Sequence, residues 1–82
     1  MNTEELRAIV LATLMSIAPE VMADELAPAK PLRDQVDLDS MDWLNFLIGL
    51  NERLGIDIPE ADYRLLTTLE VIVEYLAARL PA

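Results

Sequence analysis

Hydrophobic residues recur every three or four positions along three stretches of this chain, a spacing that predicts amphipathic helices. The first helix is expected to begin at Thr3, whose hydroxyl is suited to cap it, and to end near Pro19. Glu4 and Glu5 follow the cap and favour the positive end of the helix dipole. The apolar stripe of this helix consists of Leu6, Ile9, Val10, Leu14 and Ile17.

Residues 19–39 have weak periodicity and several prolines, so we expect a long loop with one short turn within 21–26. Structureless connections longer than about 12 to 15 residues are uncommon in compact domains. We therefore expect apolar residues of the loop to tie it to the core, namely Leu32, Val36 and Leu38.

A second helix is expected from Asp39 or Ser40 to Leu54, with Gly55 directly after its end. Its apolar stripe consists of Met41, Leu44, Leu47, Ile48 and Leu50. Trp43 and Phe46 fall partly outside this stripe.

The last third of the chain predicts a link, a short helical segment and a third long helix. Two isoleucines in 56–58 should pack inward, and Pro59 suits the first turn of a segment over 59–63. Residues 67–70 match a capping box, with Thr67 as the cap and Glu70 reaching back to its amide. The apolar face of the last helix, which stops at Pro81, consists of Leu69, Ile72, Val73, Leu76, Ala77 and Leu80.

Three longer helices and one short one predict an all-α fold, a small four-helix bundle with a long loop between its first two long helices. With 82 residues, below the common domain size of about 100 to 150, the chain is expected to form a single domain over 1–82. No apolar run approaches the roughly 18 residues needed to span a bilayer, and residues 1–18 open with acids. We therefore expect a cytoplasmic protein.

Fifteen Asp and Glu residues against six Lys and Arg give a formal net charge of −9. This charge repels phosphate backbones and anionic surfaces, so neither nucleic acid nor a membrane is an expected partner. An acidic surface is suited to docking on basic patches of other proteins, although solvation alone explains it equally well. The chain has no Cys and no His, the usual nucleophile and proton shuttle, so we do not expect an enzyme.

The sequence Asp39-Ser40-Met41-Asp42 places one hydroxyl between carboxylates where the loop gives way to the second helix. Capping alone explains most Asp-Ser pairs before a helix, since both residues are favoured caps. A phosphodiester on Ser40 would also be stabilised there, because unpaired amides and the helix dipole favour negative charge at a helix N-terminus. Ser40 is therefore the candidate site for attaching a reactive group.

The order of these features resembles that of acyl and peptidyl carrier proteins, in which a serine at the start of the second helix carries 4'-phosphopantetheine. Asp39, Ser40, Met41 and Asp42 match the family motif of Asp, Ser, an aliphatic residue and often an acid. The resemblance covers nearly the whole chain, including the Ile-Pro link at 58–59. It implies an acyl-carrier-type bundle in which 4'-phosphopantetheine from coenzyme A is attached covalently to Ser40.

The resemblance also implies a discrete acyl carrier protein that holds an acyl or aminoacyl thioester and presents it to partner enzymes. Its partners would be a phosphopantetheinyl transferase, an acyl ligase or acyltransferase, and downstream acyl-processing enzymes, with the carrier itself a monomer. Asp39 would interact with the divalent ion that neutralises the pyrophosphate of coenzyme A. The residues that the transferase or partners would recognise are Asp39, Met41, Asp42 and Trp43.

Two departures from the fatty-acid carriers favour a specialised pathway over housekeeping fatty-acid synthesis. Asn45, Asn51 and Arg53 occupy positions of the second helix where those carriers often have acids. The Gly that commonly lies shortly before the motif is absent, and Val-Asp-Leu stands at 36–38 instead.

The sequence leaves two alternative roles for each of two groups of apolar residues. Trp43, together with Met41, would form an apolar contact beside the prosthetic group, or it fills a gap under the loop near Leu38. Six others either line a cavity that shelters the acyl chain or are ordinary core residues. They are Phe46, Leu50, Ile58, Leu66, Leu69 and Val73.

The alternatives to a carrier are a calcium-binding protein and an unmodified interaction module. A calcium loop counted from Asp37 would put Asp42 where an EF-hand needs Gly and Ile48 where it needs Glu, so no metal site is expected. The main alternative is an unmodified helical interaction module, whose acidic face binds a basic partner and which would tolerate Ser40→Ala.

Overall fold

The structure, a computed structural model, describes residues 2–80. Three long helices, α1 (Thr3–Ile17), α3 (Ser40–Leu54) and α4 (Leu69–Arg79), surround one hydrophobic core. A short helix, α2 (Leu32–Gln35), and two 3-10 turns, η1 (Ala23–Glu25) and η2 (Glu60–Leu65), lie in the connections. The predicted all-α bundle with a long connection between the first two long helices is confirmed.

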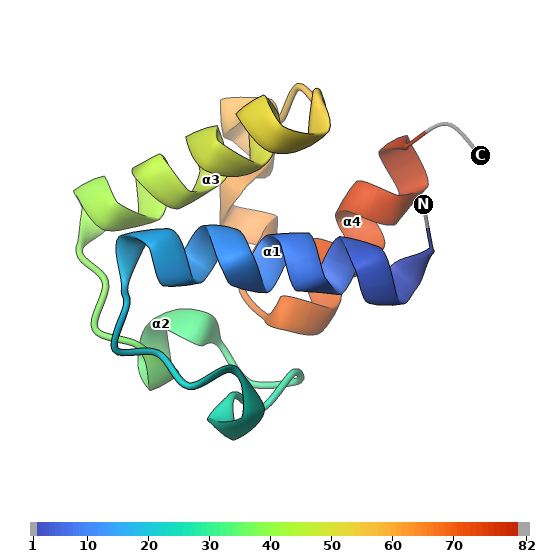
Figure 1. Cartoon of the computed structure of the whole chain (residues 1–82). Coiled ribbons are helices and arrows are strands. Elements are labelled where there is room, and N and C mark those ends of the chain that lie inside the picture. Colours follow the sequence, from blue (N-terminus) through green and yellow to red (C-terminus); the bar gives the residue numbers. More distant parts are fainter. Residues whose placement is uncertain (1, 81–82) are drawn as a thin grey trace.

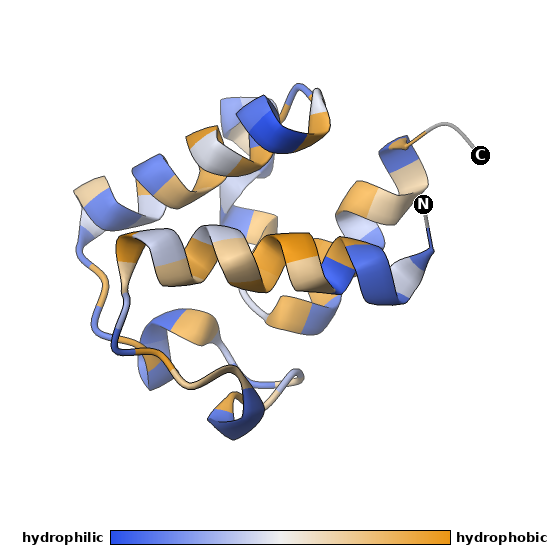
Figure 2. Cartoon of the chain, in the orientation of Figure 1, coloured by the Kyte–Doolittle hydropathy of each residue, from blue (hydrophilic) through white to orange (hydrophobic). Residues whose placement is uncertain are grey.

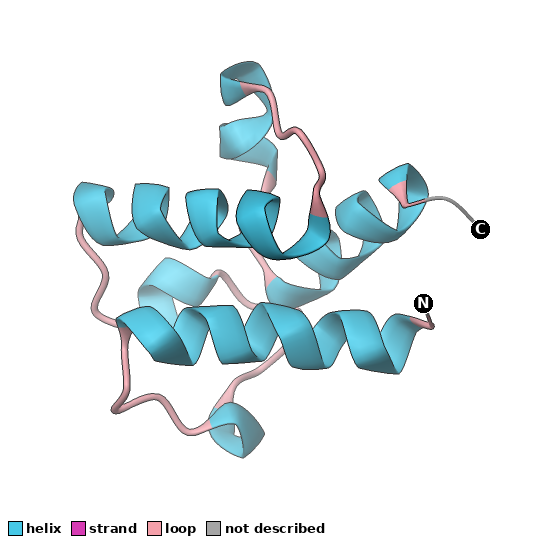
Figure 3. Ribbon diagram, turned by 45° about the horizontal axis from the view of Figure 1, so that its top comes forward, coloured by secondary structure: helices cyan, strands magenta, loops and turns pink. Residues whose placement is uncertain are grey.

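The helix α1 lies at the centre of the bundle. It packs against both α3 and α4, and α1 and α3 run side by side in opposite directions (Figures 1 and 3). Hydrophobic and hydrophilic positions alternate around each helix, so that each has an apolar side for the core (Figure 2). No helix within residues 2–80 combines the length and the apolar character that crossing a membrane requires.

The cap of α1 differs from the prediction. The side chain of Asn2 accepts a hydrogen bond of 2.8 Å from the amide of Glu5, so Asn2 is the N-cap and Thr3 is the first helical residue. Asn is the better cap of the two, because its side-chain carbonyl reaches the third helical amide with less crowding than a β-branched hydroxyl. Of the predicted stripe, Leu6, Val10 and Leu14 are buried, whereas Ile9 and Ile17 are half-buried.

The connection 18–39 is long but well anchored. Its turn η1 lies within the predicted 21–26, and Leu32, Val36 and Leu38 are buried as predicted. The helix α2 was not predicted, because four residues are too few to show a helical period.

The helix α3 has the predicted bounds but a different buried face. Phe46 is fully buried, whereas Met41 and Ile48, which were expected on the core side, are 64% and 43% exposed. Trp43 is half-buried against the core. The helix is rotated so that its two aromatic rings face inward, which removes more apolar area from water than burying Met41 and Ile48 would.

The cap of α4 is Thr68 and not Thr67. The hydroxyl of Thr68 accepts a hydrogen bond of 3.0 Å from the amide of Val71, and the predicted capping box with Glu70 does not form. Thr67 is tied to the loop before α2, since its carbonyl accepts a 2.8 Å hydrogen bond from the amide of Leu32. Ala77, expected on the apolar face, is exposed.

The segment between α3 and α4 packs inward. Ile56 and Ile58 are buried, as predicted for the link. The short helical segment is the 3-10 turn η2, which begins at Glu60 directly after Pro59. The phenol of Tyr75 in α4 donates a 2.5 Å hydrogen bond to Asp62 in this turn, so η2 is joined to α4 at the surface.

Candidate functional site

Ser40 is the first residue of α3, and it is exposed. Its hydroxyl makes no hydrogen bond to any of residues 2–80. The other serine of the chain, Ser16, lies inside α1, and its hydroxyl donates a 2.6 Å hydrogen bond to the carbonyl of Thr13. Ser40 is thus the serine whose oxygen is free to react.

Asp39 fixes the backbone on which Ser40 stands. Its carboxylate accepts a 2.8 Å hydrogen bond from the amide of Asp42, and its carbonyl accepts one of 3.0 Å from the amide of Trp43. Asp39 is therefore the N-cap of α3, one of the two roles considered for it. The carboxylate is exposed, so capping leaves it open to solvent.

The first turn of α3 fits a phosphodiester on Ser40. The amides of Ser40 and Met41 donate no hydrogen bond to residues 2–80, because the first amides of a helix have no carbonyl one turn before them and the cap reaches only the amide of Asp42. These two N–H groups lie at the positive end of a 15-residue helix, where a phosphate group is stabilised. The residues present are thus suited to the group that the motif implies.

The outward face of α3 is mostly neutral. A row of exposed residues at helical spacing begins at Met41, the residue after the serine, and continues with Asn45, Ile48 and Glu52. Asp42, in the first turn, is half-buried. A partner that docks on this face meets an apolar and amide surface next to the serine.

Trp43 lies one turn from Ser40, and its ring packs inward. Its centroid is 5.2 Å from that of Phe46, with the rings tilted by 45°. The indole also lines a small pocket of about 140 Å³ whose wall includes Arg33 and Leu66. Arg33 is anchored there by a hydrogen bond of 3.4 Å to the carbonyl of Leu38. Trp43 therefore contributes to the core and to a surface pocket near the motif.

The six residues considered for an acyl cavity are all buried in the core. They come from α3, the link, the end of η2 and α4, so the fold does bring them together. Leu66 also reaches the pocket beside Trp43, which connects this part of the core to the surface. Their use by an acyl chain stays a prediction.

Sequence reasoning missed the contribution of the loop to this region. Pro31, Arg33 and Thr67 line the pocket beside Trp43, although nothing in their spacing indicates it. They meet because the loop pairs with the residues before α4, with Pro31 and Thr68 forming an isolated bridge. Only the tertiary structure shows this pairing.

Comparison with known proteins identifies the kind of site. The family model described as the phosphopantetheine attachment site matches residues 4–76, a range that includes Ser40 and the whole of α3. The chain belongs to this family of phosphopantetheine-binding carriers. The carrier is therefore not an enzyme, and its prosthetic group is 4'-phosphopantetheine.

Curated relatives of this carrier are acyl carrier proteins. It is 26% identical over 66 residues to that of Thermobifida fusca, covering 80% of this chain and 84% of the relative. It is 29% identical over 79 residues to that of Streptomyces coelicolor, covering 96% and 82% respectively. Both relatives are thus similar to this chain over most of its length, in keeping with the family match.

Solved structures agree in fold. The carrier superposes on the solution structure of a candidate acyl carrier protein from Anaplasma phagocytophilum with a TM-score of 0.83 and 26% identity, covering 95% of this chain and 91% of the other. The acyl carrier protein of Enterococcus faecalis gives a TM-score of 0.75 at 21% identity, with 96% and 99% covered. The bundle in Figure 1 is thus the acyl carrier fold.

Proposed function

We propose that Ser40 carries the phosphopantetheine arm and that this carrier serves a specialised acyl pathway in the cytoplasm rather than housekeeping fatty-acid synthesis. The observation that supports Ser40 is its free, exposed hydroxyl at the start of α3, next to two unpaired amides. Ser16 offers no such oxygen, because its hydroxyl is bound to the backbone of its own helix.

The residues of this chain bind and position, and partner enzymes carry out the chemistry. During loading, the oxygen of Ser40 would form a bond to the pantetheine-bearing phosphorus of coenzyme A while the P–O bond of the pyrophosphate breaks. Adenosine 3',5'-bisphosphate would leave, and the hydroxyl proton would pass to a base of the transferase. The amides of Ser40 and Met41 favour the negative charge that then stands on the serine. Once attached, the arm supplies a thiol that holds the acyl group as a thioester.

Tethering explains why weak docking of partners is sufficient. An acyl group attached at Ser40 is presented to a docked enzyme at a high effective concentration, so transfer needs only a brief encounter. Asp39, Met41, Asp42 and Trp43 surround the attachment point and are proposed as the contacts of the transferase and of later enzymes. Of these, Met41 has 64% of its surface exposed.

The specialised pathway is supported by the charge of α3. The helix carries two acidic residues and one basic residue over Ser40–Leu54. The part of its exposed face nearest the serine consists of the uncharged residues Met41, Asn45 and Ile48. An enzyme that selects its carrier by an acidic second helix would find little charge here. We therefore propose an acyl ligase or acyltransferase with an apolar docking site as the loading partner.

Loading by a transferase tests the attachment site. Purified carrier is incubated with coenzyme A, magnesium and a broad-specificity phosphopantetheinyl transferase, and its intact mass is recorded. We expect one phosphopantetheine adduct on the wild type and on Ser16→Ala, and none on Ser40→Ala. Absence of an adduct on the folded wild type, with the transferase active on another carrier, would support an unmodified interaction module instead.

A further inference from the structure

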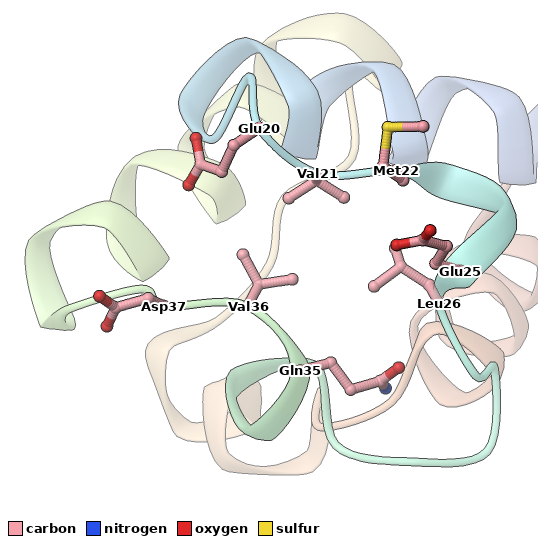
Figure 4. Close-up of a pocket in the computed structure, with 8 residues that line it drawn as sticks. All are labelled: Glu20, Val21, Met22, Glu25, Leu26, Gln35, Val36 and Asp37. Carbon is pink, nitrogen blue, oxygen red and sulfur yellow. The ribbon is translucent and has the colours of Figure 1, made fainter.

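A pocket of about 260 Å³ lies in the connection between α1 and α3, outside the site described above. Its inner wall is apolar, and Val21, Leu26 and Val36 point toward one another across it (Figure 4). Three carboxylates stand around it, those of Glu20, Glu25 and Asp37. The pocket therefore combines an apolar interior with a negatively charged rim.

The three carboxylates form no hydrogen bond or ion pair that would stabilise the fold within residues 2–80. Glu20, Glu25 and Asp37 are exposed, and their side chains make no hydrogen bond to any of residues 2–80. Within residues 2–80 the one ion pair joins Arg79 to Asp62, and neither residue belongs to the pocket. The rim thus has three unpaired negative charges.

Negative charge is concentrated in this connection rather than on α3. Residues 19–39 contain six acidic and two basic residues, a net charge of −4, whereas 40–54 has a net charge of −1. Steering by charge therefore directs a basic partner surface toward the connection more strongly than toward α3.

The walls of the pocket are held in place before any partner binds. Gln35 accepts a 2.7 Å hydrogen bond from the amide of Ala27 and donates 3.0 Å bonds to the carbonyls of Ala27 and Lys30. Val21 and Val36, both 7% exposed, fix the floor of the pocket to the core. Because little side-chain and loop ordering is needed, docking here loses little conformational entropy.

The pocket is close to the attachment site. Asp37 is three residues from Ser40, so their Cα atoms are at most about 11 Å apart. In Figure 4 Asp37 lies beside the beginning of α3. Even a transient interface of about 600 Å² per partner covers a disc of about 14 Å radius, so an enzyme centred on Ser40 also covers Asp37.

We propose that this pocket receives a lysine or arginine side chain of an enzyme that acts on the arm at Ser40. The aliphatic stem of that side chain lies against Val21, Leu26 and Val36, and its charged end lies between the carboxylates. The pocket thus supplies the charge recognition that the neutral face of α3 lacks. This inference rests on the proposed function of Ser40.

The first test measures loading kinetics with the phosphopantetheinyl transferase. The pocket variant combines Glu20→Gln, Glu25→Gln and Asp37→Asn. The control variant combines Asp57→Asn, Glu60→Gln and Glu74→Gln, which change the net charge equally at exposed positions on other elements. Circular dichroism establishes that both variants are folded.

We expect the pocket variant to raise KM for the carrier about fivefold to tenfold at low salt with kcat unchanged, and the control variant to raise it less than about twofold. Added salt should reduce the difference between the wild type and the pocket variant. Equal KM values for the two variants would overturn the proposal, because the effect would then come from net charge alone.

A second test does not depend on loading. The amide resonances of the ¹⁵N-labelled carrier are followed while Nα-acetyl-lysine methylamide is added, with the norleucine analogue as the uncharged control probe. The lysine probe should shift the amides of Val21, Leu26 and Val36 in the wild type and not in the pocket variant. If the wild type is not loaded, the proposed function fails, whereas an absence of shifts contradicts the pocket alone.

Discussion

Trp43 and Met41 lie two residues apart at the start of α3 and have opposite surroundings. The indole of Trp43 packs on Phe46 and lines the pocket beside Leu66, whereas Met41 is 64% exposed. We expect Trp43→Ala to lower the free energy of unfolding by about 2 kcal/mol, since it removes a large half-buried ring. Met41→Ala should change it by less than about 0.5 kcal/mol. Urea denaturation of both variants measures the difference.

The same two variants separate packing from partner contact. If Met41 is a docking residue, Met41→Ala raises KM in transferase loading while stability is unchanged. Transfer that is normal in both variants, with Trp43→Ala destabilised, would contradict the apolar contact proposed beside the prosthetic group.

At the residue scale the sequence predicted the local geometry around Ser40 better than it predicted the packing of α3. The motif at 39–42 marked an exposed hydroxyl at a helix start, because capping residues are read from local sequence alone. The exposure of Met41 and Ile48, which were assigned to the apolar stripe of the helix, was not predicted. Both faces of α3 carry apolar residues, and its packing against α1, which local sequence does not show, decides which face is buried.

The two threonines before α4 give a matched test of an element boundary. Thr68→Ala removes the hydroxyl that accepts from the amide of Val71, and it should destabilise the protein by about 1 kcal/mol. Thr67→Ala should have a much smaller effect, since only the backbone of Thr67 is used. Thermal unfolding of both variants measures this. A larger destabilisation by Thr67→Ala than by Thr68→Ala would support the predicted capping box instead.

The contact between α1 and α3 gives a second test. A Cβ atom at Gly49 would lie 2.9 Å from Cγ2 of Thr13, which is buried. Thr13 is held in place, because its hydroxyl donates to the carbonyl of Ile9 and accepts from Arg53. We expect Gly49→Ala to destabilise the protein by about 1 kcal/mol, although alanine has the higher helix propensity.

A double variant shows whether this contact is the cause. Thr13→Ser removes Cγ2 and keeps the hydroxyl, so Gly49→Ala should be neutral or stabilising in the Thr13→Ser background. A Gly49→Ala cost that is the same in both backgrounds would rule out the contact with Thr13. Urea denaturation of the wild type, the two single variants and the double variant gives the coupling free energy between positions 13 and 49.

The three long helices and the two 3-10 turns were predictable from local sequence, whereas α2 and the cap of α4 were not. The bounds of α3 follow from Asp39 before it and Gly55 after it, whose φ of 68° is the left-handed conformation that favours glycine. The helix α2 and the cap at Thr68 depend on hydrogen bonds from Gln35 and on pairing of Leu32 with Thr67. Leu32 and Thr67 are far apart in the sequence, and Gln35 bonds to the loop rather than within a helical turn, so no helical period indicates these contacts.

For the whole molecule, the surface contact between Tyr75 and Asp62 joins the last helix to η2. Arg79 lies over the ring of Tyr75, with its guanidinium carbon 3.5 Å from the ring centroid. One guanidinium nitrogen of Arg79 is 3.6 Å from the carboxylate of Asp62. Desolvation and the hydrogen bond to Asp62 raise the pKa of Tyr75 above its usual value of 10.0, although the charge of Arg79 opposes this. The neutral phenol therefore favours the folded state.

This contact predicts a dependence of stability on alkaline pH. Its contribution is complete below the unfolded pKa of Tyr75 and is lost as pH rises through the higher folded pKa. Tyr75→Phe should lower stability by about 1 kcal/mol at about pH 8, and the difference should shrink by about pH 11. Thermal unfolding over this range measures it, with Tyr63→Phe as the control. A difference independent of pH would exclude the ionisation of Tyr75 as its cause.

Attachment of the arm through the hydroxyl of Ser40 is tested most directly by fragment-ion mass spectrometry of the carrier after loading and digestion. The phosphopantetheine mass is expected on the peptide that contains Ser40, with fragment ions that place it on this residue. An adduct on Ser16 or on any threonine, or a fully unmodified chain beside a loaded control carrier, would contradict the proposed site.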